Sequence, residues 1–469
     1  MQPRTPVRLL CTAIAASAVV SASAQAQAQK AVPVRELSAV DAKTTVHFGN
    51  IFGVRPLAGG KLLVNDGIRR QLMMLDANLS NPTVVIDSVS EGGNSYGRSA
   101  APLIPYLADS SLFVDGASLS LLVIDPNGKV ARVMAAPKPT DLRFLAGGAS
   151  GVDAQGNLVY RGSLTINRSN MRMDGPGGMP TMVQPPDSAP IVRASFETRT
   201  VDTIGRVKIQ SGSRTTMMQD SDGKMNAKMI VNPLPTIDEW AVLSDGSVAF
   251  VRGHDYHIDW IRPDGKTVSS AKLPFDWKRL TDDDKLKLID SARTAIEKAQ
   301  ADAKAAGASS GAAAVGAAMG SATGGGAQME IRVMSTMGAA GGGGGMSVGA
   351  PGGGASGPMT NFVMPTPTIE FVPLNEIADY YPAIRSGAAR ADLDGNLWIL
   401  PTTSAQSKAG ELVYDVVNNR GELTQRVRIP LGRSVAGFGR DGVVYLMYRD
   451  AAKGWFLERA KVGAVSTTN

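Results

Sequence analysis

The chain has 469 residues, of which 43% are hydrophobic and 19% charged, a balance that excludes wholesale disorder and collagen-like architecture. It contains 52 glycines, a single cysteine and 5% aromatic residues, and its formal net charge is +6. So mild a charge on so long a chain argues against nucleic acid as a partner. After the N-terminal segment, no apolar run reaches the length of a membrane-spanning helix, so we expect no membrane span.

The first thirty residues have the layout of a secretory signal. Two arginines precede an apolar run, Leu9–Val20, which is too short to cross a bilayer comfortably, and three overlapping A-x-A cleavage sites follow. We therefore predict that residues 1–28 are removed and that the mature protein is periplasmic or secreted, an uncleaved anchor being the alternative. Cleavage removes two arginines and no acidic residue, which lowers the net charge from +6 by two, to +4. It also removes Cys11, so no thiol is left for a disulfide, a zinc site or a nucleophile.

A repeated unit begins after residue 50. Each copy has a few apolar residues, a turn containing Gly or Asp-Gly, a hydrophobic strand, and then a further strand, as in Ala391–Ile399 followed by Leu412–Asp415. Asp-Gly and Gly-Asn suit hairpin turns because they tolerate positive φ, and the flanking Val, Ile, Leu and Trp suit strands buried on both faces. The chain has six copies, with turn centres near residues 60, 110, 156, 246, 395 and 442.

The undisturbed spacing of this repeat has the length of one propeller blade. A four-stranded meander cannot bury both of its faces alone, so it must stack on copies of itself, and closing the ring protects the edge strands. The sequence therefore predicts an all-β fold, a six-bladed β-propeller of four-stranded antiparallel blades over residues 29–462, with a flexible tail at 463–469. The strand-like run Val32–Leu37 should complete the last blade as its outer strand. Two unrelated β-sandwiches are the alternative.

Two gaps in the repeat indicate insertions. The first contains Asn167–Ala189 and Ser211–Lys228, both rich in turn residues, which we interpret as long loops or an extended hairpin. A seventh blade hidden there is the alternative.

The second insertion, residues 278–365, is predicted to begin with a helix at about 282–306. Thr281 can cap this helix, and three aspartates in its first turn complement the helix dipole. Residues 307–358 are almost wholly Ala, Gly, Ser and Met, a composition that cannot bury enough apolar surface to offset its ordering entropy. This segment is predicted to be disordered, and it explains the glycine excess.

The stretch Asp392–Ile399, Asp-x-Asp-Gly-Asn-Leu-Trp-Ile, resembles the strand–turn–strand core of six-bladed propellers of the NHL-repeat and TolB-like type, of which exported bacterial proteins contain many. Tyr381–Ala383 and Leu234–Thr236 resemble the segments that lead into a blade in this group. The resemblance covers about residues 32–462 without the insertions. It implies an architecture, but hydrolases, lyases, sensors and assembly scaffolds share that architecture, so it implies no single function.

Three sets of residues could carry catalysis or bind a metal. His254 and His257 lie close in sequence, but residues three apart on a strand face opposite sides, which favours a surface turn over a metal site; His47 is the remaining histidine of the mature chain. Sugar-lactone-type propellers, which this fold resembles, use an acid, an Asn and an Asp around a divalent ion, and Glu239, Asn50 and Asp392 could imitate that calcium site. No G-x-S-x-G motif precedes a predicted helix, and the run of five glycines at 341–345 lacks the lysine of a phosphate loop.

A positional pattern of arginines suggests a binding site. Four arginines lie shortly before the first turn of a blade, near the start of the innermost strand, and such positions ring one mouth of a propeller channel. Guanidinium groups with nearby aromatic rings can bind carboxylate or phosphate groups or an acidic peptide. The alternative is that each arginine pairs with an acid of its own blade. The residues are Arg98, Arg143, Arg385 and Arg433, with Tyr96, Tyr106 and Tyr381.

The sequence thus favours an exported, non-enzymatic propeller that binds or scaffolds an unknown protein or an anionic ligand at its central channel. A metal-dependent hydrolase or lyase in that channel is the alternative, and a carrier whose insertion docks a partner is a third hypothesis. We expect a monomer without a cofactor, calcium being the one ion considered.

Overall fold

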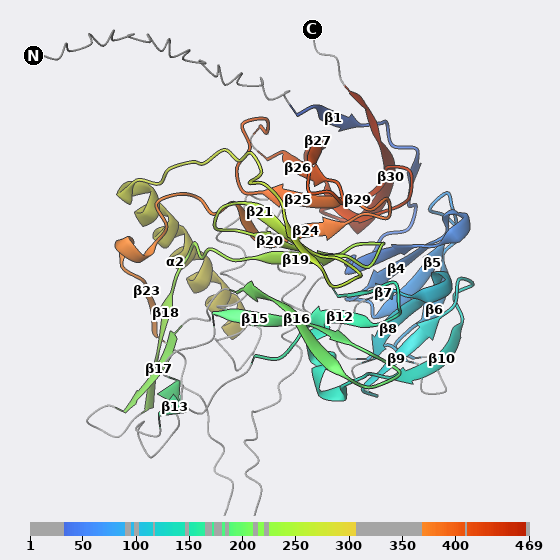
Figure 1. Ribbon diagram of the computed structural model, residues 1–469, viewed down its shortest axis with the longest axis horizontal. Coiled ribbons are helices and arrows are strands. Elements are labelled where there is room, and N and C mark those ends of the chain that lie inside the picture. The colour runs from blue at the N-terminus through green and yellow to red at the C-terminus, as the bar shows by residue number, and fades with distance from the viewer. Residues whose placement is uncertain are drawn as a thin grey trace, which may run out of the picture. The chain divides into compact units, whose positions relative to one another are not determined.

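The computed structural model describes most of the chain that was expected to form the propeller (Figure 1). The predicted signal peptide and the predicted disordered segment 307–358 lie outside the described residues, as does Arg98. The described residues are 32–89, 95–97, 103–115, 118–145, 150–164, 171–172, 181–182, 187–209, 214–219, 225–305, 368–408 and 410–465.

The fold is all-β in its main body, with four separate four-stranded antiparallel sheets that follow one another along the chain (Figure 1). The first sheet is β3 (Gly53–Pro56), β4 (Leu62–Asp66), β5 (Gln71–Leu75) and β6 (Thr83–Ile86). The second is β7 (Leu103–Pro105), β8 (Ser111–Asp115), β9 (Ser120–Ile124) and β10 (Val130–Ala135). The third is β11 (Gly151–Val152), β12 (Leu158–Arg161), β15 (Ser188–Ala194) and β16 (Val201–Lys208), and the fourth is β19 (Glu239–Val242), β20 (Val248–Arg252), β21 (His257–Ile261) and β22 (Thr267–Ser269).

A nine-stranded sheet completes the propeller-like arrangement. It contains the antiparallel run β24 (Ile384–Ala391), β25 (Leu397–Pro401), β26 (Leu412–Val417) and β27 (Leu423–Ile429). It also contains the run β28 (Ser434–Phe438), β29 (Val443–Asp450) and β30 (Gly454–Val465). Strand β1 (Val34–Leu37) lies between the two runs, and β2 (Ala42–Lys43) pairs with β30.

The N-terminal strand joins the two runs of this nine-stranded sheet. β1 pairs antiparallel with β30, as the sequence predicted, so it adds an outer strand to the last run. It also pairs in parallel with β27, with Arg35 opposite Val427, a connection that the repeat pattern did not predict. β30 continues to Val465, past the boundary expected at residue 462. Chain segments about 400 residues apart therefore stabilise each other through backbone hydrogen bonds.

The first hairpin turn of each run touches the turn of the next one. Gly156, with φ +84°, would carry a Cβ only 2.9 Å from Leu107 of the preceding sheet, and Gly246, with φ +83°, would carry one 2.8 Å from the backbone nitrogen of Ala154. Glycine is needed at both positions because the backbone is left-handed and the neighbouring turn leaves no room for a side chain. The Asp-Gly pattern therefore sets the contacts between sheets as well as the hairpins.

Hydrogen bonds at these turns also connect neighbouring runs. The carboxylate of Asp109 accepts a hydrogen bond from Arg55 at 2.9 Å and thereby connects the second sheet to the first. The carboxylate of Asp394 accepts the backbone N–H groups of Asp441 at 3.0 Å and Gly442 at 2.8 Å, which connects β24–β27 to β28–β30.

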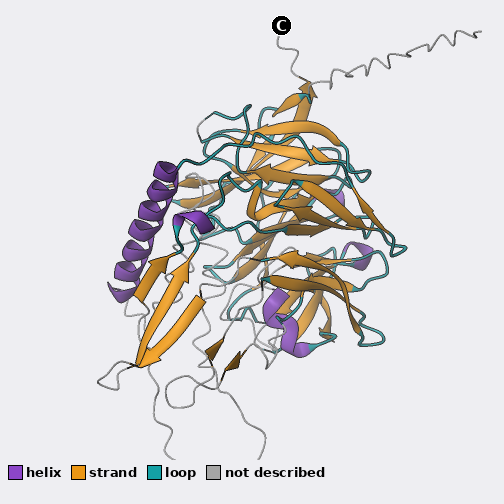
Figure 2. Cartoon of the chain, turned by 60° about the vertical axis from the view of Figure 1, so that its left-hand side comes forward, coloured by secondary structure: helices purple, strands orange, loops and turns teal. Residues whose placement is uncertain are grey.

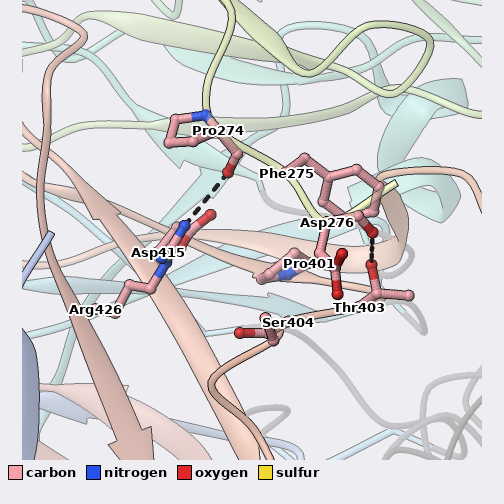
Figure 3. A pocket seen from close by; sticks show the side chains of 9 residues that line it. Pro274, Phe275, Asp276, Pro401, Thr403, Ser404, Asp415 and Arg426 are labelled. Carbon is pink, nitrogen blue, oxygen red and sulfur yellow. Dashed lines mark hydrogen bonds and ion pairs between the residues drawn. The ribbon is translucent and has the colours of Figure 1, made fainter. Parts of the chain in front are cut away.

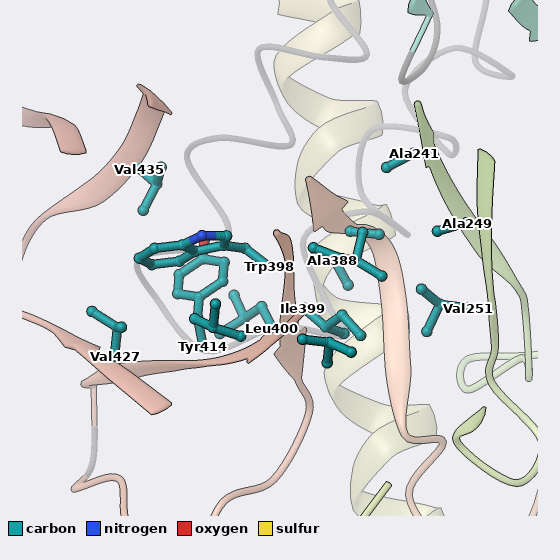
Figure 4. Packing of buried hydrophobic residues seen from close by; sticks show 14 of the residues in the cluster. Ala241, Ala249, Val251, Ala388, Trp398, Ile399, Leu400, Tyr414, Val427 and Val435 are labelled. Atoms are coloured by element: carbon teal, nitrogen blue, oxygen red, sulfur yellow. The ribbon is translucent and has the colours of Figure 1, made fainter. Parts of the chain in front are cut away.

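The hydrophobic core lies between neighbouring sheets. One buried cluster is shared by the first three sheets, and another by the fourth sheet and the two runs of the nine-stranded sheet. In the second cluster the Trp398 ring packs 5.8 Å from that of Tyr414 and 4.7 Å from that of Phe438, centroid to centroid (Figure 4). Its indole N–H donates to Asp392 at 2.9 Å, so the aspartate of the Asp-x-Asp-Gly turn also satisfies a buried donor.

The two insertions form one accessory module, which we define as β17 (Arg214–Gln219), β18 (Met225–Val231), β23 (Thr368–Phe371) and the helix α2 (Asp282–Ala305) (Figure 2). The hairpin β17–β18 agrees with the extended-hairpin interpretation of Ser211–Lys228, and the helix lies within one residue of its predicted end. β18 pairs in parallel with β23, so the insertions build one three-stranded sheet, which the sequence analysis did not foresee. Within the described chain, this region is therefore not a seventh four-stranded blade.

The helix of the accessory module is amphipathic and packs on the module's sheet. Ile296 is buried with Met229 and Val231 of β18, and Ile289 lies in a second buried cluster. Its start is capped reciprocally: the Thr281 hydroxyl accepts from the Asp284 N–H, and the Asp284 carboxylate accepts from the Thr281 N–H. The remaining elements are the short helix α1 (Leu142–Leu145), the strands β13 (Met171–Arg172) and β14 (Thr181–Met182), and the 3-10 turns η1 (Ala58–Gly60), η2 (Leu107–Asp109), η3 (Pro139–Asp141) and η6 (Leu374–Glu376).

Candidate binding site

The arginines expected at a channel mouth have different environments. Arg143 lies in α1, and its side chain is outside the described set; Arg385 lies on β24. The Arg433 guanidinium forms an ion pair with Glu458, with Nε 2.5 Å from Oε2, and stacks over the Tyr448 ring at 5.6 Å. Arg433 thus pairs with an acid of its own run, as the alternative interpretation holds. Convergence of the four arginines on a ligand stays a prediction.

The tyrosines of the same set are also used locally. Tyr96 is completely buried, and its hydroxyl donates to Asn65 at 2.6 Å, so it is a core residue. Tyr106 packs edge-on against Phe196, and Tyr381 has the ammonium of Lys278 5.7 Å from its ring centre.

The histidine cluster forms a hydrogen-bonded turn. His257 Nδ1 lies 2.6 Å from Asp255 and Nε2 lies 3.3 Å from Asp259, whereas His254 is exposed in the preceding turn. Burial raises the pKa of Asp255, but the hydrogen bond and charge of His257 and Lys272 outweigh it and lower that pKa overall. Within the part of the chain that the structure describes, no three His, Cys, Asp or Glu side chains are placed to hold a metal ion.

The three residues considered for calcium each accept hydrogen bonds from other groups of the protein. The Glu239 carboxylate accepts from the Gly387 N–H at 3.0 Å, and the Asn50 side-chain oxygen accepts from the Gly67 N–H at 2.7 Å. Asp392 caps its own turn and binds the indole of Trp398. A calcium role for them stays untested.

A cavity of about 230 Å³ lies between the β24–β27 run and the connection that leads from the fourth sheet to the accessory module (Figure 3). The connection after β22 supplies three lining residues, the loop between β25 and β26 supplies three, and one residue each comes from β25, β26 and β27. The lining residues are Pro274, Phe275, Asp276, Pro401, Thr403, Ser404, Ala405, Asp415 and Arg426.

Two lining residues, Asp415 and Arg426, belong to a buried chain of three polar side chains, whose third member, Tyr256, lies behind the lining. Tyr256 and Asp415 are at most 1% exposed, and the Tyr256 hydroxyl donates to Asp415 Oδ2 at 2.7 Å. Arg426 is directly opposite Asp415 in the strand pairing, and its Nε donates to Asp415 Oδ1 at 2.7 Å. The other guanidinium nitrogens of Arg426 donate to the Gln406 side chain at 3.0 Å and to the Pro274 carbonyl at 3.3 Å.

Burial sets the protonation behaviour of this chain. Burial raises the pKa of Asp415, and the Arg426 charge with the Tyr256 hydrogen bond partly offsets that rise. Burial and the nearby Asp415 charge raise the pKa of Tyr256 well above its ordinary value, so its hydroxyl stays a donor at neutral pH. Tyr256 therefore holds Asp415, and Asp415 holds Arg426, which at 17% exposed is the member of the chain that a ligand can reach.

The opposite wall combines Asp276, the hydroxyls of Thr403 and Ser404, and the Phe275 ring (Figure 3). The Thr403 hydroxyl donates to the Asp276 carbonyl at 2.5 Å, which joins the two loops that line the cavity. Phe275 lies 5.6 Å from the Tyr256 ring and 4.7 Å from the Trp277 ring, and Trp277 lies 6.4 Å from Tyr380. Trp277 is 43% exposed, so a row of rings leads from the buried Tyr256 to the surface.

The sequence analysis missed this cavity because its walls are assembled from distant segments. Tyr256 and Asp415 are 159 positions apart, and only the packing of neighbouring sheets brings them together. The available signal was Asp415 itself, a carboxylate within the apolar strand Leu412–Val417, since a buried acid requires partners.

No protein-family model matches the chain, and no curated protein matches it. Solved structures to which it is similar include a streptogramin B lyase, with a TM-score of 0.31 and 9% identity over 90% of this chain and 86% of the other. They also include regucalcin, a calcium-binding protein from Agrobacterium tumefaciens, with a TM-score of 0.30 and 10% identity over 92% of this chain and 97% of the other. A third is the PQQ-bound aldose sugar dehydrogenase from Streptomyces coelicolor, with a TM-score of 0.34 and 10% identity over 92% of this chain and 100% of the other. TM-scores this low carry no argument about function.

No helix among the described residues is long and apolar enough to cross a membrane.

Proposed function

We propose that this chain is an exported, non-enzymatic six-bladed propeller that binds a small ligand in the cavity beside Arg426. The blade count is supported by the series of hairpin turns, which passes through all six repeat units, and by a bond from Arg390 to the Val435 carbonyl at 2.7 Å between β24 and β28. Export is supported by the sequence of residues 1–28 alone.

The observation that carries the binding role is the buried hydrogen-bonded chain of Tyr256, Asp415 and Arg426, of which Asp415 and Arg426 line the cavity. Burying an acid and a tyrosine hydroxyl costs free energy unless each is paired, and here each has a partner in fixed geometry. Arg426 is thereby presented to the cavity with its side chain already ordered, which lowers the entropic cost of binding. Because the carboxylate is neutralised by Arg426, and the tyrosine is a donor, neither is suited to act as a general base.

Ligand-dependent thermal stability tests this proposal. The protein is screened against small carboxylates, phosphates, amines, amino acids and saccharides by differential scanning fluorimetry. At least one class should raise the Tm of the native protein, and Ala405→Trp, which fills the cavity from an exposed lining position, should abolish the rise. Ala452→Trp, at an exposed turn position of the β28–β30 run, is the matched control and should keep it.

Two other results would redirect the assignment. If the rise survives Ala405→Trp but is lost in Arg385→Ala/Arg433→Ala, the site is the channel mouth suggested by the arginine pattern. If mass spectrometry of the recovered ligand shows a converted product, the protein is an enzyme, as the hydrolase or lyase alternative holds. If no ligand class raises the Tm, the cavity is not a small-ligand site and the proposal fails.

A further inference from the structure

We infer that the cavity takes one ring of a neutral saccharide, with the adjoining sugar ring lying against Trp277. This inference rests on the proposed function, because it names the ligand class of that same cavity. Three independent properties of the site carry it: its charge balance, its mixture of donors and acceptors, and the exposed aromatic platform beside it.

The charge balance disfavours anionic ligands, since the two carboxylates of the lining outnumber its one guanidinium. Arg426 is the one cation that lines the described cavity, and its charge is already paired with Asp415. An anionic ligand would approach the carboxylates of Asp276 and Asp415, and a cationic ligand would approach the Arg426 guanidinium. A neutral ligand avoids both repulsions.

The hydrogen-bonding groups match hydroxyls, which donate and accept at the same carbon. Arg426 has five N–H groups, and three are used for Asp415, Gln406 and Pro274, which leaves two for a ligand. The Asp276 carboxylate can accept, and the Ser404 hydroxyl can do either. A polyol can satisfy all of these groups at once, whereas a simple amine or carboxylate satisfies only one kind.

The size of the cavity fits a single small ring. At about 30 Å³ per water molecule, 230 Å³ corresponds to the volume of seven or eight waters. That is below the roughly 300 Å³ at which pockets for drug-sized ligands begin. A longer ligand must therefore continue outside the cavity, past the residues next to Phe275.

The surface next to Phe275 is an ordered aromatic platform. Trp277 packs edge-on against Phe275 with an interplanar angle of 85° and against Tyr380 at 88°, and both Trp277 and Tyr380 are more than 40% exposed. The backbone beneath them is fixed, because Tyr381 N–H donates to the Lys278 carbonyl at 3.0 Å and Leu280 N–H donates to that of Asp379 at 2.8 Å. An exposed aromatic ring held in place provides apolar area for the C–H face of a sugar at low entropic cost.

Tryptophan fluorescence reports on this platform directly. The chain has five tryptophans; Trp277 is 43% exposed and the other four are at most 7% exposed. Iodide should therefore quench Trp277 selectively. The probes are neutral tetrasaccharides (cello-, malto- and laminaritetraose), with chitosan tetramer, tetragalacturonate and choline as charged comparisons. At least one neutral tetrasaccharide should protect the fluorescence from iodide, and the charged probes should not.

Single-residue variants show where on the protein the tetrasaccharide binds. Asp276→Asn should weaken tetrasaccharide binding by about tenfold or more, the expected loss for one charge-assisted hydrogen bond, and Asp290→Asn on the exposed face of α2 should leave it unchanged. Trp277→Ala, followed by calorimetry, should weaken the tetrasaccharide while leaving any monosaccharide binding in place. Ala405→Trp should abolish both.

The outcomes separate this inference from the proposed function. If no neutral saccharide protects Trp277, but another class gives a Tm rise that Ala405→Trp abolishes, the inference is wrong and the binding function stands. If protection occurs but survives Ala405→Trp, the saccharide lies elsewhere and the inference is wrong. If no class gives a cavity-dependent rise, both fail.

Discussion

Replacing Tyr256 by phenylalanine removes the hydroxyl that donates to the lining residue Asp415 without removing the ring. The lost bond is 2.7 Å long and ends on a carboxylate that is 1% exposed, so water cannot replace the hydroxyl. A hydrogen bond to a charged group contributes about 1.5–3 kcal/mol, and the free energy of unfolding should fall by that amount. At roughly 2 °C per kcal/mol for a chain of this size, the Tm should fall by about 3–6 °C.

The pH dependence of this variant identifies the cause. Burial already raises the pKa of Asp415, and loss of the Tyr256 hydrogen bond raises that pKa further. Ionised Asp415 is therefore the species that the variant destabilises, so the Tm difference from the native protein should be largest at neutral pH and should shrink as the pH falls through the folded-state pKa.

Tyr414→Phe is the matched control for this experiment. Tyr414 is 4% exposed on the same strand as Asp415, and its hydroxyl donates no hydrogen bond within the residues that the structure describes. It should lose much less stability than Tyr256→Phe. Equal losses in the two variants, or a Tyr256→Phe difference that grows in acid, would refute the reasoning.

Three further predictions concern the rest of the molecule. Deleting residues 29–40 should lower the Tm by many degrees, because β1 hydrogen-bonds both β27 and β30; an unchanged melt would contradict this. Excising 307–358 with a short linker should keep the β signal in circular dichroism and nearly the same Tm, since its composition offers little apolar area; loss of soluble protein would overturn it. The pKa of Asp76 is lowered to about 2, chiefly by accepted hydrogen bonds from Ser80 and Asn81, so its charged form stabilises the fold above its ordinary pKa of 3.8. That contribution is lost as the pH falls towards 2. The lower Tm of Asp76→Asn at pH 6 should therefore approach that of the native protein near pH 2, and a Tm difference that stays constant with pH would contradict this role of Asp76.

Much of the fold could be predicted because its determinants are local. Glycine in a tight turn and alternating runs of Val, Ile and Leu specify a hairpin within a few residues, and Thr281 with its aspartates specifies the start of α2. The pairing of β1 with β27, and of β18 with β23, could not be predicted, because parallel partners far apart in sequence leave no turn between them.

The candidate site could not be predicted from residue types. Arg433 has the same place in the sequence, shortly before a blade turn, whether its side chain faces the channel or pairs with Glu458. The two cases differ only in where the strand that carries Glu458, 25 residues later, lies. Likewise Tyr256 lies between His254 and His257 in the sequence, and nothing in that segment indicates that its hydroxyl donates to Asp415 of a neighbouring run. Sites built by sheet packing depend on side-chain direction, which local sequence does not fix.

A crystal structure of the mature protein soaked with the ligand that gives the largest Tm rise tests the central claim most directly. The ligand should lie in the cavity between Arg426 and Phe275, within hydrogen-bonding distance of the guanidinium and of Asp276. Ligand density at the mouth of the central channel instead, with the cavity unchanged, would contradict the account.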